Sequence, residues 1–148
     1  MAENFLDDGD SSAMILGDNM FDTDFTSAIQ NFQGGGKVFA KEVSDPERFG
    51  VVKFDDQLKA VEIVEKPKTF LSNHALTGMY IFDNNVVKIA KNVQPSERGE
   101  IEITEIMNWY LKKGELDVEI IDGQWIDAGT FESYYKANQW AYEKSQKE

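Results

Sequence analysis

The sequence of residues 102–114 is Glu-Ile-Thr-Glu-Ile-Met-Asn-Trp-Tyr-Leu-Lys-Lys-Gly. Its apolar positions fall at i, i+3, i+4, i+7 and i+8, as Ile103, Ile106, Met107, Tyr110 and Leu111. This spacing places all of them on one face of an α-helix, and a glycine at position 114 is the residue type that most often ends one. We therefore predict an amphipathic helix over residues 102–113.

The segments on either side of this helix alternate between strand and helix patterns. Short apolar runs bounded by turn residues predict strands over residues 12–16, 37–43, 50–54, 60–65, 75–82, 116–121 and 124–126, with the first of them buried. Helical spacing predicts further helices over 25–32, 84–92 and 131–144, and residues 1–6 have the pattern of a helix end. Asp22 and Thr23 are the capping candidates for the first of these helices, and Thr130 for the last. The order predicts an α/β fold, a mixed sheet flanked by helices in a single domain over residues 1–148.

Composition excludes several classes of function. The chain of 148 residues has 15 Lys+Arg against 27 Asp+Glu, a net charge of −12, with one His and no Cys. Nucleic-acid binders need cations to neutralise phosphates, so we expect none here. The lack of Cys excludes disulfides and thiolate chemistry, and a single His excludes a multi-His zinc site. Carboxylates remain, and they favour chemistry with a hard metal ion. No stretch is apolar enough for a membrane span and the N-terminus is acidic, so we expect a cytoplasmic, membrane-free protein.

Two aspartates are candidates for a metal site. Asp18 follows an apolar strand and Gly17, and Asp127 repeats that arrangement before Gly129. A strand that ends in Asp places a carboxylate at the edge of the sheet, where α/β proteins bind ligands, and two such carboxylates can hold Mg²⁺. The structural alternatives are that both residues form turns and that Thr130 caps the following helix.

Charged residues elsewhere suggest an anion site. Glu65 and Lys66 end a strand before Pro67. Neighbouring strand residues point to opposite faces, so both enter one site only if strand pairing breaks there. Arg48 and Arg98 are the two arginines, and each lies in a loop close to a glycine, where a guanidinium can clamp phosphate. Surface ion pairs are the alternative for each of these groups.

Three further features have simpler structural explanations. The Asp22-Thr23-Asp24 segment has the D-x-D spacing of metal-dependent glycosyltransferases, but helix capping explains it directly. The glycines 34–36 lack the Lys-Ser/Thr of a phosphate-binding P-loop and predict a plain loop. His74 has no partner at metal-ligand spacing and is expected to be a packing or surface residue.

Six motifs in register resemble one enzyme family. They are Leu-Gly-Asp-Asn-Met-Phe (16–21), Asp-Pro-Glu-Arg-Phe-Gly-Val-Val (45–52), Val-Glu-Lys-Pro (64–67), Leu-Thr-Gly-Met-Tyr-Ile-Phe-Asp (76–83), Arg-Gly-Glu-Ile-Glu-Ile-Thr-Glu (98–105) and Trp-Ile-Asp-Ala-Gly-Thr (125–130). Together they resemble the bacterial glucose-1-phosphate thymidylyltransferases, which make dTDP-glucose and pyrophosphate from glucose-1-phosphate and dTTP for dTDP-rhamnose synthesis. The resemblance implies a partial Rossmann-like domain of the GT-A type.

The resemblance also implies roles for residues within the motifs. Asp18 and Asp127 match the two Mg²⁺ ligands of the family, and Lys66 and Arg98 match the cations that clamp the sugar phosphate. Glu65 matches the acid that binds the glucose hydroxyls. The remaining matches line the sugar pocket: Gly50, Thr77, Gly78, Tyr80 and Trp125. Phe49 and Ala128 depart from the family, which commonly has tyrosine and threonine there.

One family motif has no counterpart in this sequence. Nothing matches the G-G-x-G-T-R-L loop with which the family cradles the nucleotide phosphates and supplies a catalytic arginine. The resemblance thus implies a chain that retains the sugar-phosphate and Mg²⁺ half of the site and has little activity alone. Its expected partners are glucose-1-phosphate, dTTP, and either further copies of itself or a chain that supplies the other half. The alternative is a truncated, non-catalytic module for sugar-phosphate binding or interaction.

Overall fold

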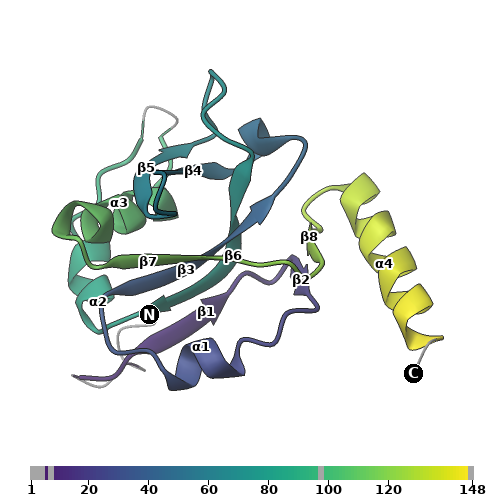
Figure 1. Cartoon of the computed structure of the whole chain (residues 1–148), viewed down its shortest axis with the longest axis horizontal. Coiled ribbons are helices and arrows are strands. Elements are labelled where there is room, and N and C mark those ends of the chain that lie inside the picture. Colours follow the sequence, from purple (N-terminus) through teal and green to yellow (C-terminus); the bar gives the residue numbers. More distant parts are fainter. Residues whose placement is uncertain (1–5, 7–8, 97–98, 147–148) are drawn as a thin grey trace.

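The computed structural model of the chain describes residues 6, 9–96 and 99–146 (Figure 1). Its strands are β1 Ser12–Ile15, β2 Asn19–Phe21, β3 Gly36–Glu42, β4 Gly50–Phe54, β5 Ala60–Glu65, β6 His74–Phe82, β7 Leu116–Ile120 and β8 Trp125–Asp127. Its helices are α1 Thr26–Gln30, the 3₁₀ turn η2 Pro46–Arg48, α2 Asn85–Ala90, α3 Ile103–Lys113 and α4 Phe131–Ser145. The predicted α/β class is confirmed. The helix end predicted over residues 1–6 falls almost entirely outside the described residues.

The strands form a mixed sheet of six and a small sheet of two. The larger sheet has the order β5-β4-β6-β3-β7, with β1 also paired to β6, and the smaller sheet pairs β2 with β8. The β3–β7 pair is parallel, whereas the pairs that β6 makes with β1, β3 and β4 are antiparallel. Strand β6 is therefore the central element, and eight of its nine residues are buried.

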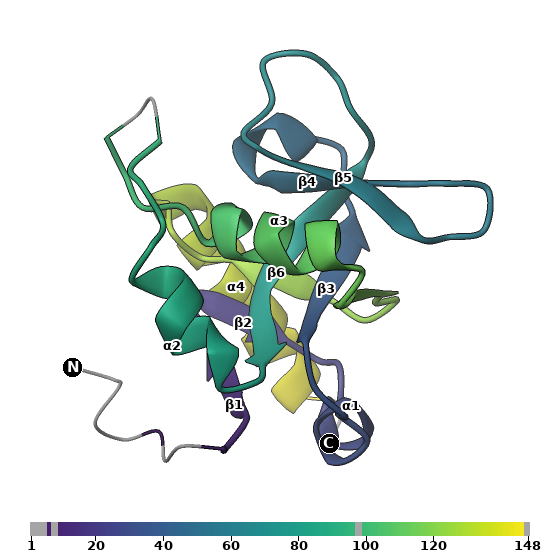
Figure 2. The same ribbon diagram turned by 90° about the vertical axis from the view of Figure 1, so that its left-hand side faces the viewer.

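Alternating side chains of the sheet build a core on each face. On one face, Val38, Ala40 and Tyr80 pack with Ile106 and Met107 of α3, which lies across β6 in Figure 2. This is the apolar face predicted for residues 102–113, and Gly114 ends the helix in the left-handed conformation at φ 70°. On the other face, Phe39, Ala75 and Met79 pack with Trp125 and with Ala28 of α1. The sheet thus holds β8 against one side of β6 and α3 against the other.

The prediction of a buried first strand is wrong. Strand β1 pairs with β6 along one edge only, and Met14, Ile15 and Leu16 are 41%, 57% and 40% exposed. An apolar run of strand length predicts a strand but cannot tell whether another element covers it.

The cap predicted for α1 from Asp22 or Thr23 is wrong: the N-cap residue is Phe25, and it makes no side-chain capping bond. Asp24, rather than Asp22 or Thr23, accepts a hydrogen bond from the Thr26 backbone N–H at 2.8 Å. Asp22 instead accepts a bond from the Gln124 backbone N–H, which ties the end of β2 to β8. Both carboxylates of the D-x-D spacing are therefore engaged in local structure. Among the described helices, none has the length and apolar character needed to cross a lipid bilayer.

Candidate functional site

The two predicted metal carboxylates lie together at the junction of β2 and β8. Asn19 pairs with Asp127 in the strand register, and the Ala128 backbone N–H donates to the Asp18 carbonyl at 2.7 Å. A Cβ added to Gly129 would lie 2.9 Å from Asp127 Oδ1 and 3.3 Å from Asp18 Oδ2. The two side chains therefore border one small space beside a residue that has no side chain of its own.

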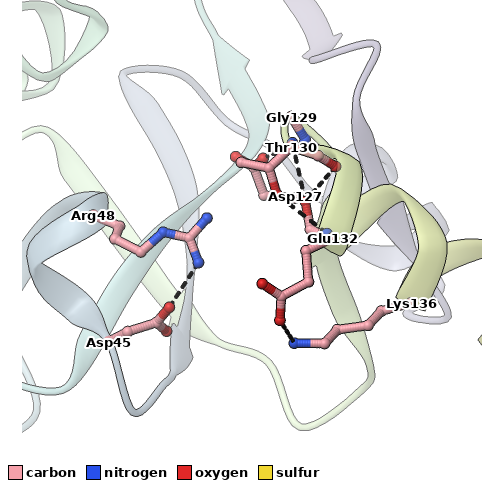
Figure 3. Close-up of polar contacts among 8 residues, drawn as sticks. Asp45, Arg48, Asp127, Gly129, Thr130, Glu132 and Lys136 are labelled. Atoms are coloured by element: carbon pink, nitrogen blue, oxygen red, sulfur yellow. Dashed lines mark hydrogen bonds and ion pairs between the residues drawn. The ribbon is translucent and has the colours of Figure 1, made fainter.

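The structural alternatives for this segment are also realised. Asp127 Oδ1 accepts a bond from the Gly129 N–H at 2.9 Å, which forms a turn. Thr130 and Ser133 form a reciprocal capping box at the start of α4. Figure 3 shows Thr130 beside Asp127. Asp127 thus has both a turn-forming oxygen and a position facing Asp18.

The donor chemistry of this pair fits Mg²⁺. Magnesium is commonly held by one or two carboxylates, with waters and substrate phosphates completing its octahedron. Within residues 9–96 and 99–146, no group of three or more His, Cys, Asp or Glu side chains forms a complete metal cage. Asp18 and Asp127 would therefore hold such an ion only together with further oxygen ligands.

A cavity of about 230 Å³ lies next to Asp127 and collects most of the predicted sugar-site residues. Its lining includes Gly50, Glu65, Lys66, Thr77, Gly78, Tyr80, Trp125 and Asp127. These residues come from β4, β5, β6 and β8 and from the turn after β5, so the topology alone brings them together. Arg98 lies outside the described residues, and its predicted role stays a prediction.

Glu65 and Lys66 both reach this cavity because strand geometry breaks between them. Strand β5 ends at Glu65, and Lys66 takes the left-handed backbone conformation with φ 42°. The Lys66 backbone N–H donates to the Phe49 carbonyl at 2.9 Å, which holds this turn against the loop before β4. Strand alternation would send the two side chains to opposite faces, and the turn removes that restriction.

Two buried hydroxyls in the cavity wall lack a hydrogen-bond partner among the described residues. They are Thr77 Oγ1, on β6, and Thr104 Oγ1, on α3. The lack of a side chain at Gly50 lets Thr104 and Glu65 pack closely against the backbone there. A Cβ at this position would lie 2.8 Å from the Thr104 methyl and 3.1 Å from a Glu65 carboxylate oxygen. Buried hydroxyls are normally satisfied, and a polar ligand in the cavity would explain this pair; Thr23 Oγ1, outside the cavity, is also without a partner among the described residues.

The pKa of Tyr80 is affected by burial and by the carboxylates around the cavity. Burial raises the pKa of the Tyr80 hydroxyl well above its ordinary value, and the carboxylates of Glu65, Asp18 and Asp127 add to the rise. The Tyr80 hydroxyl therefore stays protonated and remains a donor throughout the physiological range. The carboxylates of Glu65, Asp18 and Asp127 therefore all lie close enough to Tyr80 to act on its hydroxyl.

Arg48 lies at the mouth of the cavity, between it and a neighbouring cleft of about 360 Å³ that is also bordered by α4. Its guanidinium donates to Asp45 at 2.7 Å, as Figure 3 shows. That bond raises the pKa of Arg48, and the charges of Asp127 and Glu132 add to the effect. The surface ion pair considered from the sequence is therefore formed, on a side chain that faces the site.

Two lining residues, Asn19 and Thr104, received no role from the sequence. Asn19, which follows Asp18 in the first motif, is only 9% exposed and lines the cavity. A signal existed for Thr104, since it lies three and seven residues before Met107 and Leu111, on the apolar face of its helix. A polar residue within an apolar stripe points to a special environment. For Asn19 we find no comparable local pattern.

A larger cleft of about 850 Å³ lies elsewhere, between α2 and α3. Its lining includes Lys88, Glu105, Trp109 and Lys112, but none of the orphaned hydroxyls and neither carboxylate of the Asp18–Asp127 pair. Chemistry, and not volume, therefore places the candidate site in the smaller cavity.

Comparison with known proteins gives consistent results. The sequence model of the nucleotidyl transferase family matches residues 1–144. The glucose-1-phosphate thymidylyltransferase of Neisseria meningitidis is 41% identical over 143 residues, which is 93% of this chain and 49% of that protein. The enzyme of the same name from Mycolicibacterium smegmatis is 42% identical over 134 residues, 87% of this chain and 46% of that protein.

Solved structures agree with these relatives. A crystal structure of a Bacillus anthracis protein assigned as a glucose-1-phosphate thymidylyltransferase, in complex with sucrose, has a TM-score of 0.86 and 44% identity. The match covers 95% of this chain and 57% of that one. A UDP-glucose pyrophosphorylase bound to UDP-glucose shares the fold, with a TM-score of 0.84 at 24% identity over 97% of this chain and 60% of that one.

The chain spans about half the length of the curated relatives it matches. The fold, the six motifs and the family model nevertheless agree along nearly all of its residues. This chain belongs to the nucleotidyl transferase family.

Proposed function

We propose that this chain binds a sugar 1-phosphate together with Mg²⁺ and supplies this half of the site for nucleotidyl transfer. The observation that carries the proposal is the cavity in which two orphaned hydroxyls, an acid–base pair and one carboxylate of the Asp18–Asp127 pair lie side by side. A sugar phosphate offers matching groups. Its hydroxyls can form hydrogen bonds with the hydroxyls of Thr77 and Thr104, and its phosphate can bind the cations, Lys66 and Mg²⁺.

The role of each residue follows from its chemistry. The Glu65 carboxylate accepts bonds from sugar hydroxyls, and the Lys66 ammonium neutralises phosphate, a task that Arg98 shares through its motif. The Tyr80 hydroxyl and the small residues Gly50 and Gly78 shape the pocket, and Trp125 forms its wall. Asp18 and Asp127 hold Mg²⁺, which, when bound, stabilises the negative charge that develops on phosphate oxygens. The sugar phosphate then attacks the α-phosphorus of a nucleoside triphosphate in line, with pyrophosphate as the leaving group.

The relatives suggest the substrates. Proteins named glucose-1-phosphate thymidylyltransferase match over about nine-tenths of this chain, so glucose-1-phosphate is the first sugar phosphate to test and dTTP the first nucleotide.

Titration of the wild-type chain with glucose-1-phosphate, followed by NMR, tests the proposal. We expect weak saturable binding without nucleotide, with shifts at residues of the cavity. Lys66→Ala should weaken this binding by roughly tenfold or more, because a charge-assisted bond to phosphate contributes about 1.5–3 kcal/mol. The matched control is Lys68→Ala, an exposed lysine two residues further along that does not line the cavity. Absence of saturable binding to the wild type would refute the proposal.

A second candidate function is sugar-phosphate binding without catalysis. The same cavity supports it, because Glu65, Lys66 and Thr77 would bind a sugar phosphate whether or not a nucleotide is turned over. Pyrophosphate release from dTTP and glucose-1-phosphate separates the two functions. Binding of the sugar phosphate without pyrophosphate release would establish the binding module.

A further inference from the structure

The Asn19 side chain is buried, and both of its polar ends are engaged. Its Oδ1 accepts a bond from the Gly78 backbone N–H at 2.9 Å and another from the Trp125 indole Nε1–H at 2.6 Å. Its Nδ2 donates to Asp18 Oδ1 at 2.9 Å. One side chain thus contacts a candidate metal ligand and two walls of the sugar cavity.

These contacts connect the two sheets. Asn19 itself lies on β2, directly after Asp18, and pairs with Asp127 on β8 in the small sheet. Gly78 lies on β6, in the large sheet that carries Thr77 and Tyr80 of the cavity. The Asn19 carboxamide therefore determines where the carboxylate pair sits relative to the sugar pocket.

Only a carboxamide of this size satisfies all three partners. Two donors face its oxygen and one carboxylate faces its NH₂ group, so acceptor and donor must be at opposite corners of one planar group. An aspartate would place a second negative oxygen against Asp18, and an apolar side chain would leave two buried N–H groups without an acceptor.

Gly78 is adapted to this side chain. A Cβ at position 78 would lie 2.6 Å from Asn19 Cγ and Oδ1 and 2.8 Å from Nδ2, closer than real side-chain carbons approach. The backbone of Gly78 is not left-handed, so the need for glycine there comes from the carboxamide and not from conformation.

We propose that Asn19 is a positioning residue: its carboxamide aims the Asp18 carboxylate at the space shared with Asp127 and fixes that pair against the sugar pocket. This inference rests on the proposed function for its metal ion. It has two parts. Asn19 affects metal affinity through Asp18, and the position of its carboxamide requires that residue 78 has no side chain.

Mn²⁺ alone is the probe for the first part, because it takes the oxygen ligands that suit Mg²⁺ and broadens nearby NMR signals. In the wild type, Mn²⁺ should saturably broaden the indole N–H signal of Trp125, because its Nε1–H donates a hydrogen bond to Asn19, the residue next to Asp18. Trp109, on α3, is the internal reference. Asn19→Ala should weaken Mn²⁺ affinity about tenfold, the usual effect of losing a residue that orients a metal ligand.

Asn108→Ala is the matched control. Asn108 also donates through its side-chain amide, to the Ile63 carbonyl at 3.3 Å, but far from Asp18 in the packing between α3 and β5. It should leave Mn²⁺ affinity unchanged. Equal affinity of wild type and Asn19→Ala overturns the inference, as does an equal loss in Asn108→Ala or a wild type without a saturable Mn²⁺ effect. The glucose-1-phosphate titration, run in a metal chelator, judges the proposed function separately.

A double-mutant cycle tests the second part without any metal. Gly78→Ala alone should lower the urea midpoint of unfolding strongly, because its methyl group meets the carboxamide. In the Asn19→Ala/Gly78→Ala double variant that methyl group occupies vacated space, so the midpoint should rise above that of Gly78→Ala alone. This double variant also replaces Asn19→Ala in the Mn²⁺ titration if the single variant fails to fold. Additive effects on the midpoint would contradict the proposed dependence.

Discussion

Gly129 lies beside the carboxylates of both candidate metal ligands, Asp18 and Asp127, and has no side chain to contact them. The atoms that a Cβ would meet there are the ends of the Asp18 and Asp127 side chains, which can move aside. We therefore expect Gly129→Ala to change the free energy of unfolding little but to weaken Mn²⁺ affinity roughly tenfold, by forcing the carboxylates apart. Mn²⁺ titration by water-proton relaxation measures this. Gly17→Ala, in open space on the other side of Asp18, is the control and should bind Mn²⁺ normally.

A second residue-scale feature lies at the far end of β6. Asp83 Oδ1 accepts a bond from the Tyr110 hydroxyl at 2.7 Å, and its Oδ2 accepts one from the Gly35 N–H at 3.1 Å. Burial alone would raise the pKa of Asp83, but the hydrogen bonds from Tyr110, Asn85 and Gly35 outweigh it and lower that pKa below 3.8. The ionised carboxylate thus ties the end of β6 to α3 and to the glycine loop.

The pH dependence of this contact has a definite sign. Because the pKa of Asp83 is lower in the folded chain, its stabilisation is present above about pH 4 and is lost as the pH falls through the folded value. Tyr110→Phe should lower the free energy of unfolding by about 1 kcal/mol at pH 7, and this difference should shrink below pH 4. Urea unfolding at several pH values measures it. Tyr142→Phe, at a tyrosine that is 68% exposed, should show no difference at any pH.

Residue types at the site were predictable from the sequence, but their joint placement was not. Strand alternation alone argued against a shared site for Glu65 and Lys66, and they share one because Lys66 adopts a positive φ. That conformation depends on the bond from its N–H to Phe49, a contact between residues 17 positions apart. Likewise, Asn19 acquires its surroundings only when β2, β6 and β8 assemble.

At the scale of elements, the end of α3 depends on one glycine. Gly114 has φ 70°, and a Cβ there would meet nothing within 4 Å. Alanine at this position should therefore cost only the backbone strain of a left-handed residue, about 1–2 kcal/mol. Thermal or urea unfolding of Gly114→Ala measures this. Gly17→Ala, also in open space but without a positive φ, should be neutral or slightly stabilising, and an equal loss there would contradict the argument.

Most elements were predicted because their own sequence determines them. The periodicity of residues 102–113 specified α3, and the two β-rich runs around residues 55–57 specified the β4–β5 hairpin. The predictions are wrong where contacts with residues distant in the sequence determine the local structure. Asp22 does not cap α1, whose N-cap is Phe25 without a side-chain bond; Asp22 instead accepts a bond from the Gln124 N–H, 102 residues away. Strand β1 is exposed because burial depends on what covers an element and not on its composition.

At the scale of the molecule, apolar surface collects on two elements. Strand β1 and the residue that follows it expose Met14, Ile15 and Leu16, and α4 exposes Phe131, Tyr134, Tyr135 and Tyr142. Figure 1 shows α4 standing beside β8, away from the large sheet, and among its described residues only Ala137 is buried. An edge strand with apolar side chains can pair with another chain, and large exposed apolar patches mark interaction surfaces.

We propose that this surface is covered by association, either with further copies of the chain or with a partner chain. The net charge of −12 opposes self-association at low salt, but at 0.15 M the Debye length of about 8 Å screens most of this repulsion. We therefore expect the sedimentation coefficient to rise with protein concentration at physiological salt, and to rise less at low salt. A monomer at high micromolar concentration in both buffers would contradict self-association and leave a partner chain as the only form of the proposal.

The position of the interface gives the sharpest form of this prediction. Ile15 lies on β1, which pairs with β6, and is 57% exposed, whereas Val61 lies on β5, which ends the sheet order and does not pair with β1, and is 51% exposed. A lysine at either position removes similar apolar area and adds the same charge. If association uses the β1 edge, Ile15→Lys should shift the sedimentation profile towards monomer, since a charged edge residue blocks strand pairing. Val61→Lys should leave the profile unchanged. Equal shifts in the two variants would mean that association follows net charge and not the β1 surface, because each substitution lowers the negative charge by the same amount.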